Sequence, residues 1–328
     1  MNFNIIRLHH VELHVTDLAK SRDFYVNTLG LIETEADETH IYLRGIEDTN
    51  HHCLVLTQAD RPSVNHLAYR VRSEADLNQL ERLLAGQGLP IRWLERGEET
   101  GQGRALRVQD PVGLPVEFFC EMEKAERMLQ QFHLHGGAKI KRVDHVNCMV
   151  RDVGRGYDWY REHLGFRCSE YTVTGGEDPE LWAVWLYRKP SVHDLALTSG
   201  RGPRLHHVAF WLDDAKSILD ACDVLAARGY AKQIERTPGR HGLSNAFFVY
   251  LRDPDGHRIE LYTGDYFTDE PDWEPIRWTL DDPQRATFWG AETPASWKTE
   301  ASPVQDVRTG QLLEVGEPTI RKEKVKHY

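Results

Sequence analysis

The sequence contains few cysteines, and no two of them form a recognisable pair. Its five cysteines are scattered over 328 residues, and no Cys-x-x-Cys motif occurs. An odd number of dispersed thiols argues against a disulfide framework and is typical of proteins from a reduced compartment. We therefore expect a cytoplasmic protein.

Long apolar runs and basic runs are also missing. The chain has no run of about 18 apolar residues and no charged N-terminal segment followed by a short apolar one. Its 40 Lys and Arg residues are outnumbered by 51 Asp and Glu residues, which gives a formal net charge of -11. These absences predict a protein that neither spans a membrane nor binds nucleic acid. The length and the 40% hydrophobic content are those of a soluble protein with about two domains.

What the sequence does contain is an internal repeat. Residues 9–18 resemble 144–153, residues 64–69 resemble 205–210, and the Asp-Pro-x-Gly motif at 110–113 recurs at 253–256. In each half, alternating apolar residues give way to helical spacing and then to a glycine, which predicts a strand, a helix and a turn. The proline and glycine of the Asp-Pro-x-Gly motif are typical of a tight turn between two strands.

The repeat predicts an α+β fold of tandem βαβββ modules, in two similar domains that each curl a mixed sheet around a pocket. We divide the chain into an N-terminal module without the catalytic site (1–134), a C-terminal catalytic, metal-binding module (135–267) and an extension with a tail (268–328). A helix over 122–131 is expected to lead into the join. The extension has no sustained period; its expected anchors are Trp273, Trp278, Trp289 and Trp297, and a charged tail begins near Arg321.

Two histidines and one glutamate in the second half are candidate metal ligands: His145, His207 and Glu260. Two imidazoles and one carboxylate can hold Fe(II) on one face and leave three positions open for substrate and O2. The repeat favours His207 over its neighbour His206, because His66 lies at the matching position of the first half. Any one of the three alone would be interpreted as a structural residue, so the prediction depends on the set.

Three sequence runs together carry a family resemblance: Leu205–Phe210, Arg240–Phe247 and Asp253–Tyr262. With the repeat and the ligand set, they make the chain similar to the type I extradiol catechol dioxygenases of the vicinal oxygen chelate superfamily. The resemblance covers nearly the whole chain. It implies an enzyme that inserts both atoms of O2 into a substituted catechol, gives a muconic semialdehyde in aromatic catabolism, and forms a homotetramer. It also implies Fe(II) as cofactor, although Mn(II) takes the same ligands.

The resemblance assigns roles to residues around the ligands. His193, in a strand pattern, matches the acid–base histidine; an imidazole that titrates near neutrality can take a proton from a catechol. His241 and Tyr250 match a pair that hydrogen-bonds the catecholate oxygen. Asn147 matches an asparagine beside the O2 site, and it lies two positions after His145, on the same strand face.

Arg236 carries the prediction about the substrate, because a guanidinium can hold a carboxylate through two parallel hydrogen bonds. Family members that cleave 3,4-dihydroxyphenylacetate complete this clamp with a second arginine, whose position here falls on Ala286, next to Arg285. Trp185 matches an aromatic side chain near the substrate ring, although it could equally be a core residue. The resemblance thus implies 3,4-dihydroxyphenylacetate, with a neutral alkyl-substituted catechol as the alternative.

The first half retains part of the ligand pattern. Candidate ligands are His10, His66 and Glu117, with His52 opposite His193. Counting back from the Asp-Pro turn, however, Arg107 lies opposite Tyr250 and Glu98 lies opposite His241. The first pocket would therefore lack the catecholate-binding pair, and an arginine aimed at a metal would oppose a cation. We expect no second metal.

Two other functional classes are compatible with tandem modules of this kind. Metal-dependent isomerases and lyases such as glyoxalases build one metal site from both modules, usually with two glutamates. The clustering of His193, His241 and Tyr250 in the second half favours the dioxygenase. A ligand-sequestering module of the antibiotic-resistance type is typically one short module without a metal triad, so length and triad both disfavour it.

Overall fold

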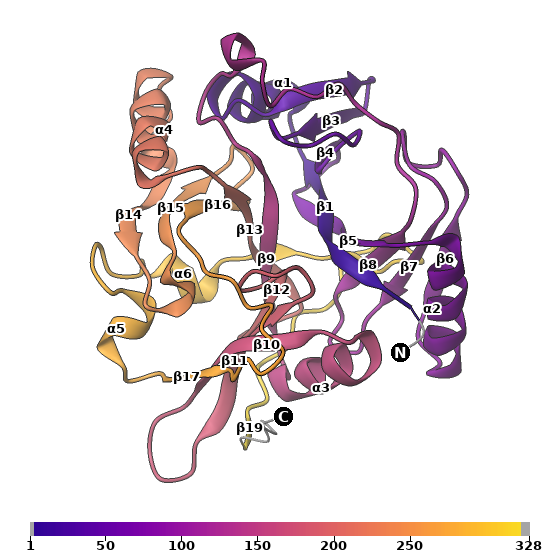
Figure 1. Ribbon diagram of the computed structural model, residues 1–328, viewed down its shortest axis with the longest axis vertical. Coiled ribbons are helices and arrows are strands. Elements are labelled where there is room, and N and C mark those ends of the chain that lie inside the picture. Colours follow the sequence, from indigo (N-terminus) through magenta and orange to yellow (C-terminus); the bar gives the residue numbers. More distant parts are fainter. Residues whose placement is uncertain (1–2, 323–328) are drawn as a thin grey trace.

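Two strongly curved mixed sheets form the structure, a computed structural model that describes residues 3–322 (Figure 1). The strand order of the first sheet is β2-β3-β4-β1-β5-β8-β7-β6. Its elements are β1 (Ile5–Val15), α1 (Leu18–Arg22), the π-helical η1 (Asp23–Thr28), β2 (Ile32–Ala36), β3 (His40–Arg44), β4 (Leu54–Gln58), β5 (Ser63–Val71), α2 (Glu74–Gly86), β6 (Ile91–Leu94), β7 (Ala105–Gln109) and β8 (Pro115–Phe119).

The second sheet has the equivalent order, β10-β11-β12-β9-β13-β16-β15-β14, so that β10 corresponds to β2 and β9 to β1. It continues beyond β10 with β17. Its elements are β9 (Arg142–Val150), α3 (Val153–Leu164), β10 (Arg167–Val173), β11 (Glu180–Tyr187), β12 (Leu195–Ser199), β13 (Arg204–Trp211), α4 (Ala215–Ala227), β14 (Ile234–Arg240), β15 (Phe247–Arg252) and β16 (Arg258–Thr263). Short 3-10 turns occur at η2 (Phe132–Leu134), η3 (Ala231–Gln233) and η4 (Leu243–Asn245). The predicted α+β fold of tandem βαβββ modules is confirmed.

The turns form where the sequence places glycine. Gly113 and Gly256 close the two Asp-Pro turns with φ of 92° and 87°, and each donates its N–H to the aspartate carbonyl at 3.0 Å. Gly165 ends α3 in the left-handed conformation at φ 69°. Only glycine adopts these angles without a steric penalty, so the turns fix where each strand begins.

The two halves hold each other through reciprocal hydrogen bonds. The Tyr25 hydroxyl of the first half donates to Asp253 at 2.9 Å, and the Tyr160 hydroxyl of the second half donates to Asp110 at 2.8 Å. Each tyrosine therefore anchors the Asp-Pro turn of the other half. One apolar core cluster runs through both halves, which makes them mutually dependent for burial.

The chain after residue 263 covers the second half and then returns to the first. It forms β17 (Ile276–Thr279), α5 (Pro283–Ala286), α6 (Ser296–Thr299), β18 (Ser302–Pro303) and β19 (Arg321–Lys322). β17 pairs in parallel with β10, and Gln305 donates its N–H to the Val64 carbonyl at 3.0 Å. Trp273 and Trp278 donate hydrogen bonds to β10, whereas Trp289 is half exposed. Of the predicted charged tail, residues 323–328 lie outside the described residues.

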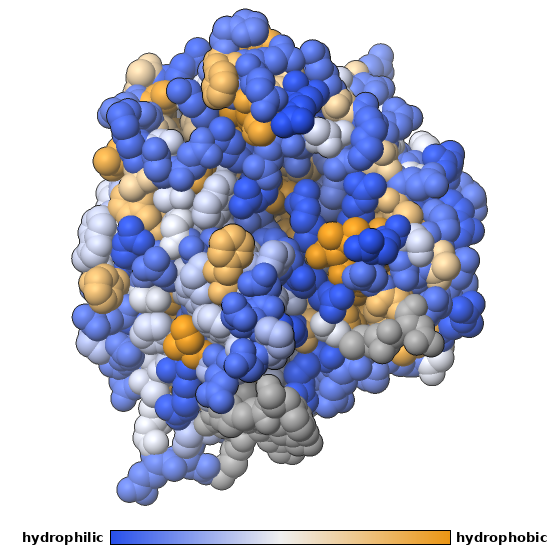
Figure 2. Space-filling view, in the orientation of Figure 1, coloured by the Kyte–Doolittle hydropathy of each residue, from blue (hydrophilic) through white to orange (hydrophobic). Residues whose placement is uncertain are grey.

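The helix expected over 122–131 does not form. Met122 and Lys124 instead make isolated bridges to Gln102 and Asn50, so the backbone at the start of this segment bonds to two loops of the first half rather than to a helical turn. None of the helices within residues 3–322 is both long and apolar enough to cross a membrane. The face shown in Figure 2 is predominantly hydrophilic, with apolar side chains only in small groups.

Candidate metal centre and active site

His145, His207 and Glu260 converge at the centre of the second sheet. They project from β9, β13 and β16, which are neighbours in the sheet. His145 Nε2 lies 3.0 Å from Glu260 Oε2, and His207 Nε2 lies 3.2 Å from the same oxygen. All three side chains are buried. Three donor atoms directed at one point form a site that could hold a metal ion.

The outer nitrogens of both histidines are also held. His145 Nδ1 lies 3.1 Å from Asp144 Oδ2, which is 3.1 Å from Lys189 Nζ. His207 Nδ1 lies 2.7 Å from Nδ1 of His206. Such outer contacts fix the ring orientation of metal-binding histidines. The sequence pattern assigned no role to Asp144 or Lys189. Asp144 could have been noticed because its carboxylate directly precedes the candidate ligand His145.

Electrostatics keep the site carboxylate ionised. Burial alone would raise the pKa of Glu260, but hydrogen bonds with His145 and His207 outweigh it and hold that pKa well below its usual range. His193 is different. Burial, together with the charge of His145, lowers the pKa of its imidazole well below the usual value, which favours a neutral ring.

His193 and Asn147 lie beside the triad. The His193 and His145 ring centroids are 3.8 Å apart. His193 precedes β12 rather than lying within it, so the expected strand position was wrong; the turn between β11 and β12 supplies it. Asn147 accepts a hydrogen bond from Thr198 at 3.1 Å, and both side chains line the same pocket.

His241 and Tyr250 form a hydrogen-bonded pair near the triad. His241 Nε2 lies 3.0 Å from the Tyr250 hydroxyl, and the His241 ring stacks on Phe248 with centroids 4.0 Å apart. The loop after His241 is fixed by the buried Glu170, which accepts the N–H of Ser244 at 2.7 Å. Ser244 has a φ of 53°, which is unusual for a non-glycine residue. Nothing in the sequence pattern pointed to Glu170.

Arg236 is buried at the pocket wall and stacks on Phe248, with its guanidinium carbon 4.4 Å from the ring centroid. Its Nε donates to the Ala291 carbonyl at 3.1 Å and its Nη2 donates to Thr287 at 2.8 Å. Its Nη1 is buried and has no hydrogen-bond partner among residues 3–322, and the same holds for Nε of Arg285. The guanidinium carbon of Arg285 lies 5.1 Å from the ring centroid of Trp182. Both arginines line the pocket.

The pocket has a volume of about 510 Å³ and opens beside the triad. Trp185 forms part of its wall and is packed with Leu243 in a small apolar cluster. All the predicted site residues of the second half border this pocket, together with Arg285 from the extension. Pocket residues that the sequence did not indicate include Trp182, Leu280, Thr293 and Trp297. These come from β11 and the extension, whose positions depend on tertiary packing.

This fold and site match known proteins. Residues 7–118 and 142–261 each match the family described as the Glyoxalase/Bleomycin resistance protein/Dioxygenase superfamily. The chain belongs to this superfamily.

Similar individual proteins narrow the activity. The chain is 34% identical to the manganese-dependent 2,3-dihydroxybiphenyl 1,2-dioxygenase of Geobacillus genomosp. 3, over 88% of this chain and 95% of the relative. It superposes on homoprotocatechuate 2,3-dioxygenase from Arthrobacter globiformis with a TM-score of 0.91 and 46% identity, over 95% of this chain and 96% of the other. The corresponding enzyme of Brevibacterium fuscum, in complex with 3,4-dihydroxyphenylacetate, gives a TM-score of 0.91 and 44% identity, over 95% and 97%. The activity of this chain is extradiol ring cleavage of catechols, and the isomerase and sequestering alternatives fall away.

Proposed function

We propose that this enzyme cleaves a catechol with an acidic side chain, of which 3,4-dihydroxyphenylacetate is the first candidate. The carrying observation is that two arginines, Arg236 and Arg285, line the same pocket as the candidate metal ligands, and each keeps one nitrogen without a hydrogen-bond partner among residues 3–322. Buried donors are rarely left unsatisfied, and a carboxylate can accept from guanidinium groups with good geometry. The solved complex of the B. fuscum enzyme with this acid supports the same substrate.

We further propose that the cofactor is Fe(II), held by His145, His207 and Glu260. The residues fit a divalent ion, because their donor atoms converge and the outer nitrogens of both histidines are held. When bound, the ion would lower the pKa of a catechol hydroxyl and transfer electron density between catechol and O2. Mn(II) is the alternative, favoured by the manganese-dependent relative.

The surrounding side chains would manage protons and charge. Tyr250, held by His241, is placed to donate a hydrogen bond to the catecholate oxygen. His193, packed against the ring of His145, would take the other proton and return it later. Asn147 would line the O2 side, and Trp185 would pack against the ring.

The modular organisation follows from these roles. We infer that residues 135–267 carry catalysis, that residues 1–134 support them, and that the extension 268–328 completes the pocket. Leu280 and Trp297 from the extension line the pocket beside Arg285, which supports this division. A homotetramer remains a prediction that sedimentation equilibrium would test.

The test is aerobic turnover by metal-free protein reloaded with Fe(II) or Mn(II). 3,4-Dihydroxyphenylacetate and 4-methylcatechol would be compared by the appearance of yellow ring-cleaved product. A strong preference for the acid supports the carboxylate proposal, whereas equal or better turnover of 4-methylcatechol overturns it and leaves the ring cleavage intact. Greater activity with Mn(II) than with Fe(II) at equal metal occupancy would overturn the iron assignment.

A further inference from the structure

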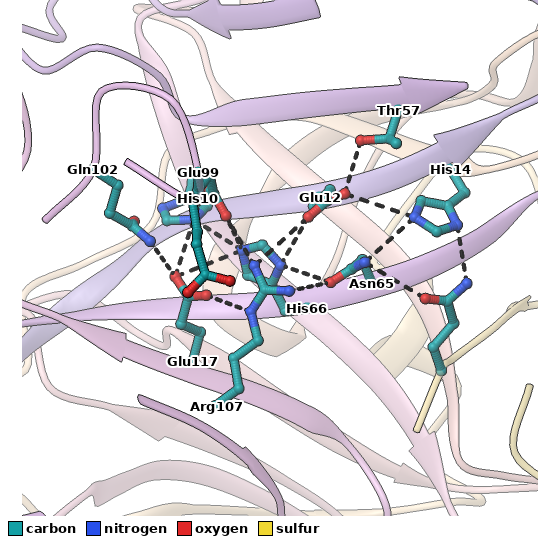
Figure 3. A network of polar contacts seen from close by, with 12 residues as sticks. His10, Glu12, His14, Thr57, Asn65, His66, Glu99, Gln102, Arg107 and Glu117 are labelled. Carbon is teal, nitrogen blue, oxygen red and sulfur yellow. Dashed lines mark hydrogen bonds and ion pairs between the residues drawn. The ribbon is translucent and has the colours of Figure 1, made fainter. Parts of the chain in front are cut away.

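The first half contains a second buried cluster of metal-ligand side chains. His10 projects from β1, His66 from β5 and Glu117 from β8, at the positions that match the catalytic triad (Figure 3). Glu99, from the loop between β6 and β7, joins them as a fourth member. Glu99 had no predicted role; the sequence count had placed its neighbour Glu98 opposite His241, and Glu98 is exposed whereas Glu99 is buried.

The spacing of the donor atoms is that of a coordination shell. His10 Nε2 lies 3.0 Å from His66 Nε2 and 3.0 Å from Glu99 Oε1. Glu117 Oε1 lies 3.6 Å from His10 Nε2 and 3.7 Å from His66 Nε2. Ligand atoms about 2.1 Å from a shared ion are roughly 3.0 to 3.5 Å apart. The contacts of His10 with His66 and Glu99 have this spacing, and Glu117 Oε1 lies slightly beyond it, within the 4.8 Å that encloses all four donor atoms.

The cluster also has the outer contacts that orient metal ligands. His66 Nδ1 lies 3.1 Å from Glu12 Oε2, a carboxylate–histidine contact of the kind found behind metal-binding imidazoles. Arg107 donates to Oε2 of Glu117 at 2.5 Å and to Oε2 of Glu99 at 2.9 Å. It thus binds the oxygens opposite the Oε1 atoms that face His10. Arg107 therefore leaves the Oε1 atoms of Glu99 and Glu117 directed toward His10, where they could contact a cation.

The buried carboxylates of the cluster outnumber its guanidinium groups. Glu12, Glu99 and Glu117 are buried carboxylates, and Arg107 is the guanidinium that contacts all three. A buried charge is unfavourable unless it is paired. A divalent ion at the point where His10, His66, Glu99 and Glu117 converge would add positive charge beside the carboxylates of Glu99 and Glu117.

We propose that the first half binds a second divalent metal ion through His10, His66, Glu99 and Glu117. Two imidazoles and two carboxylates suit Mn(II), Fe(II) or Zn(II). Four protein ligands are typical of a closed structural site. The ion would tie β1, β5, β8 and the β6–β7 loop together. The adjoining cavity is about 150 Å³, against about 510 Å³ for the catalytic pocket, and Arg107 occupies the place of Tyr250, so this site would not bind a catechol.

The test counts metal ions in a variant that lacks catalytic ligands, first with the first half intact and then with one proposed ligand of the first half removed. A double variant, His207→Ala with Glu260→Ala, removes the catalytic ligands, and a matched variant adds Glu99→Ala to that pair. The three proteins, expressed with added Mn(II) and dialysed, would be measured by elemental analysis. We expect about two metal ions per chain in the wild type, about one in the double variant and none in the triple variant.

Both variant results bear on the proposal. One tightly held ion in the double variant that is lost in the triple variant supports it. No ion in the double variant overturns it and would mean that protonated histidines and Arg107 balance the carboxylates. If the double variant loses ring cleavage but retains one ion, the retained ion is bound at the proposed site and not at the catalytic site. A Glu99→Ala variant with wild-type catalytic residues should keep ring cleavage and lose thermal stability.

Discussion

Replacing Arg236 by methionine should change substrate preference more than it changes ring cleavage itself. Methionine keeps an apolar stem against Phe248 and removes the buried guanidinium whose Nη1 has no partner within the protein. A hydrogen bond to a charged group contributes about 1.5–3 kcal/mol. A loss of about 2 kcal/mol corresponds to about a 30-fold fall in kcat/KM for the acidic substrate.

The same substitution also removes the bonds from Arg236 to the extension, so both substrates should lose some activity. The informative quantity is therefore the ratio of kcat/KM for 3,4-dihydroxyphenylacetate to that for 4-methylcatechol. Thr287→Val is the matched control, because it removes one of these bonds and keeps the guanidinium. An unchanged ratio in Arg236→Met, with normal folding and metal content, would refute the carboxylate assignment.

Three further outcomes follow from the structure. Asp144→Asn, which weakens the contact to His145 Nδ1, should reduce metal affinity at the catalytic site by about 10- to 100-fold, measured by competition with a chelator; unchanged affinity would contradict a supporting role. Tyr250→Phe should lower kcat by about 10- to 100-fold while metal content stays constant, because a donor to the catecholate oxygen is lost; an unaffected kcat would contradict that role. Glu235 is half-buried and accepts hydrogen bonds from Arg258, Arg252 and Ser296. Although burial opposes it, these hydrogen bonds lower the pKa of Glu235 from 4.5 to about 2. Its ionised form therefore stabilises the fold above pH 4.5, and this contribution is lost as pH falls toward 2. Glu235→Gln should lower the free energy of unfolding by about 2 kcal/mol at pH 7, with the difference narrowing below pH 4.5 in thermal melts; a constant difference at all pH values would contradict this cause.

Much of the catalytic half was predictable because its chemistry is fixed by local pattern. Strand alternation and the repeat marked His145, His207 and Glu260 as one set, since equivalent residues of a duplicated unit occupy equivalent positions; the structure shows that their strands are adjacent. The pairing of His241 with Tyr250 was found through the resemblance and lies where expected.

The structure corrected expectations where non-local contacts decide. Residues 122–125 bond to loops of the first half instead of forming part of a helix, and His193 lies in a turn rather than a strand. The sequence assigned no role to Glu99, which the loop between β6 and β7 turns inward beside His10 and His66. Loop conformation depends on contacts distant in sequence, which a count of residues does not contain.

The sequence by itself determined the repeat, the α+β class and the choice of His145, His207 and Glu260 as candidate metal ligands, because these depend on periodicity and on residue type. Tertiary structure alone decided how the extension closes the pocket around Arg236. It also decided which carboxylate oxygens of Glu99 and Glu117 accept hydrogen bonds from Arg107. Those outcomes rest on the direction of individual side chains and on segments far apart in the chain. Packing, rather than local pattern, sets both.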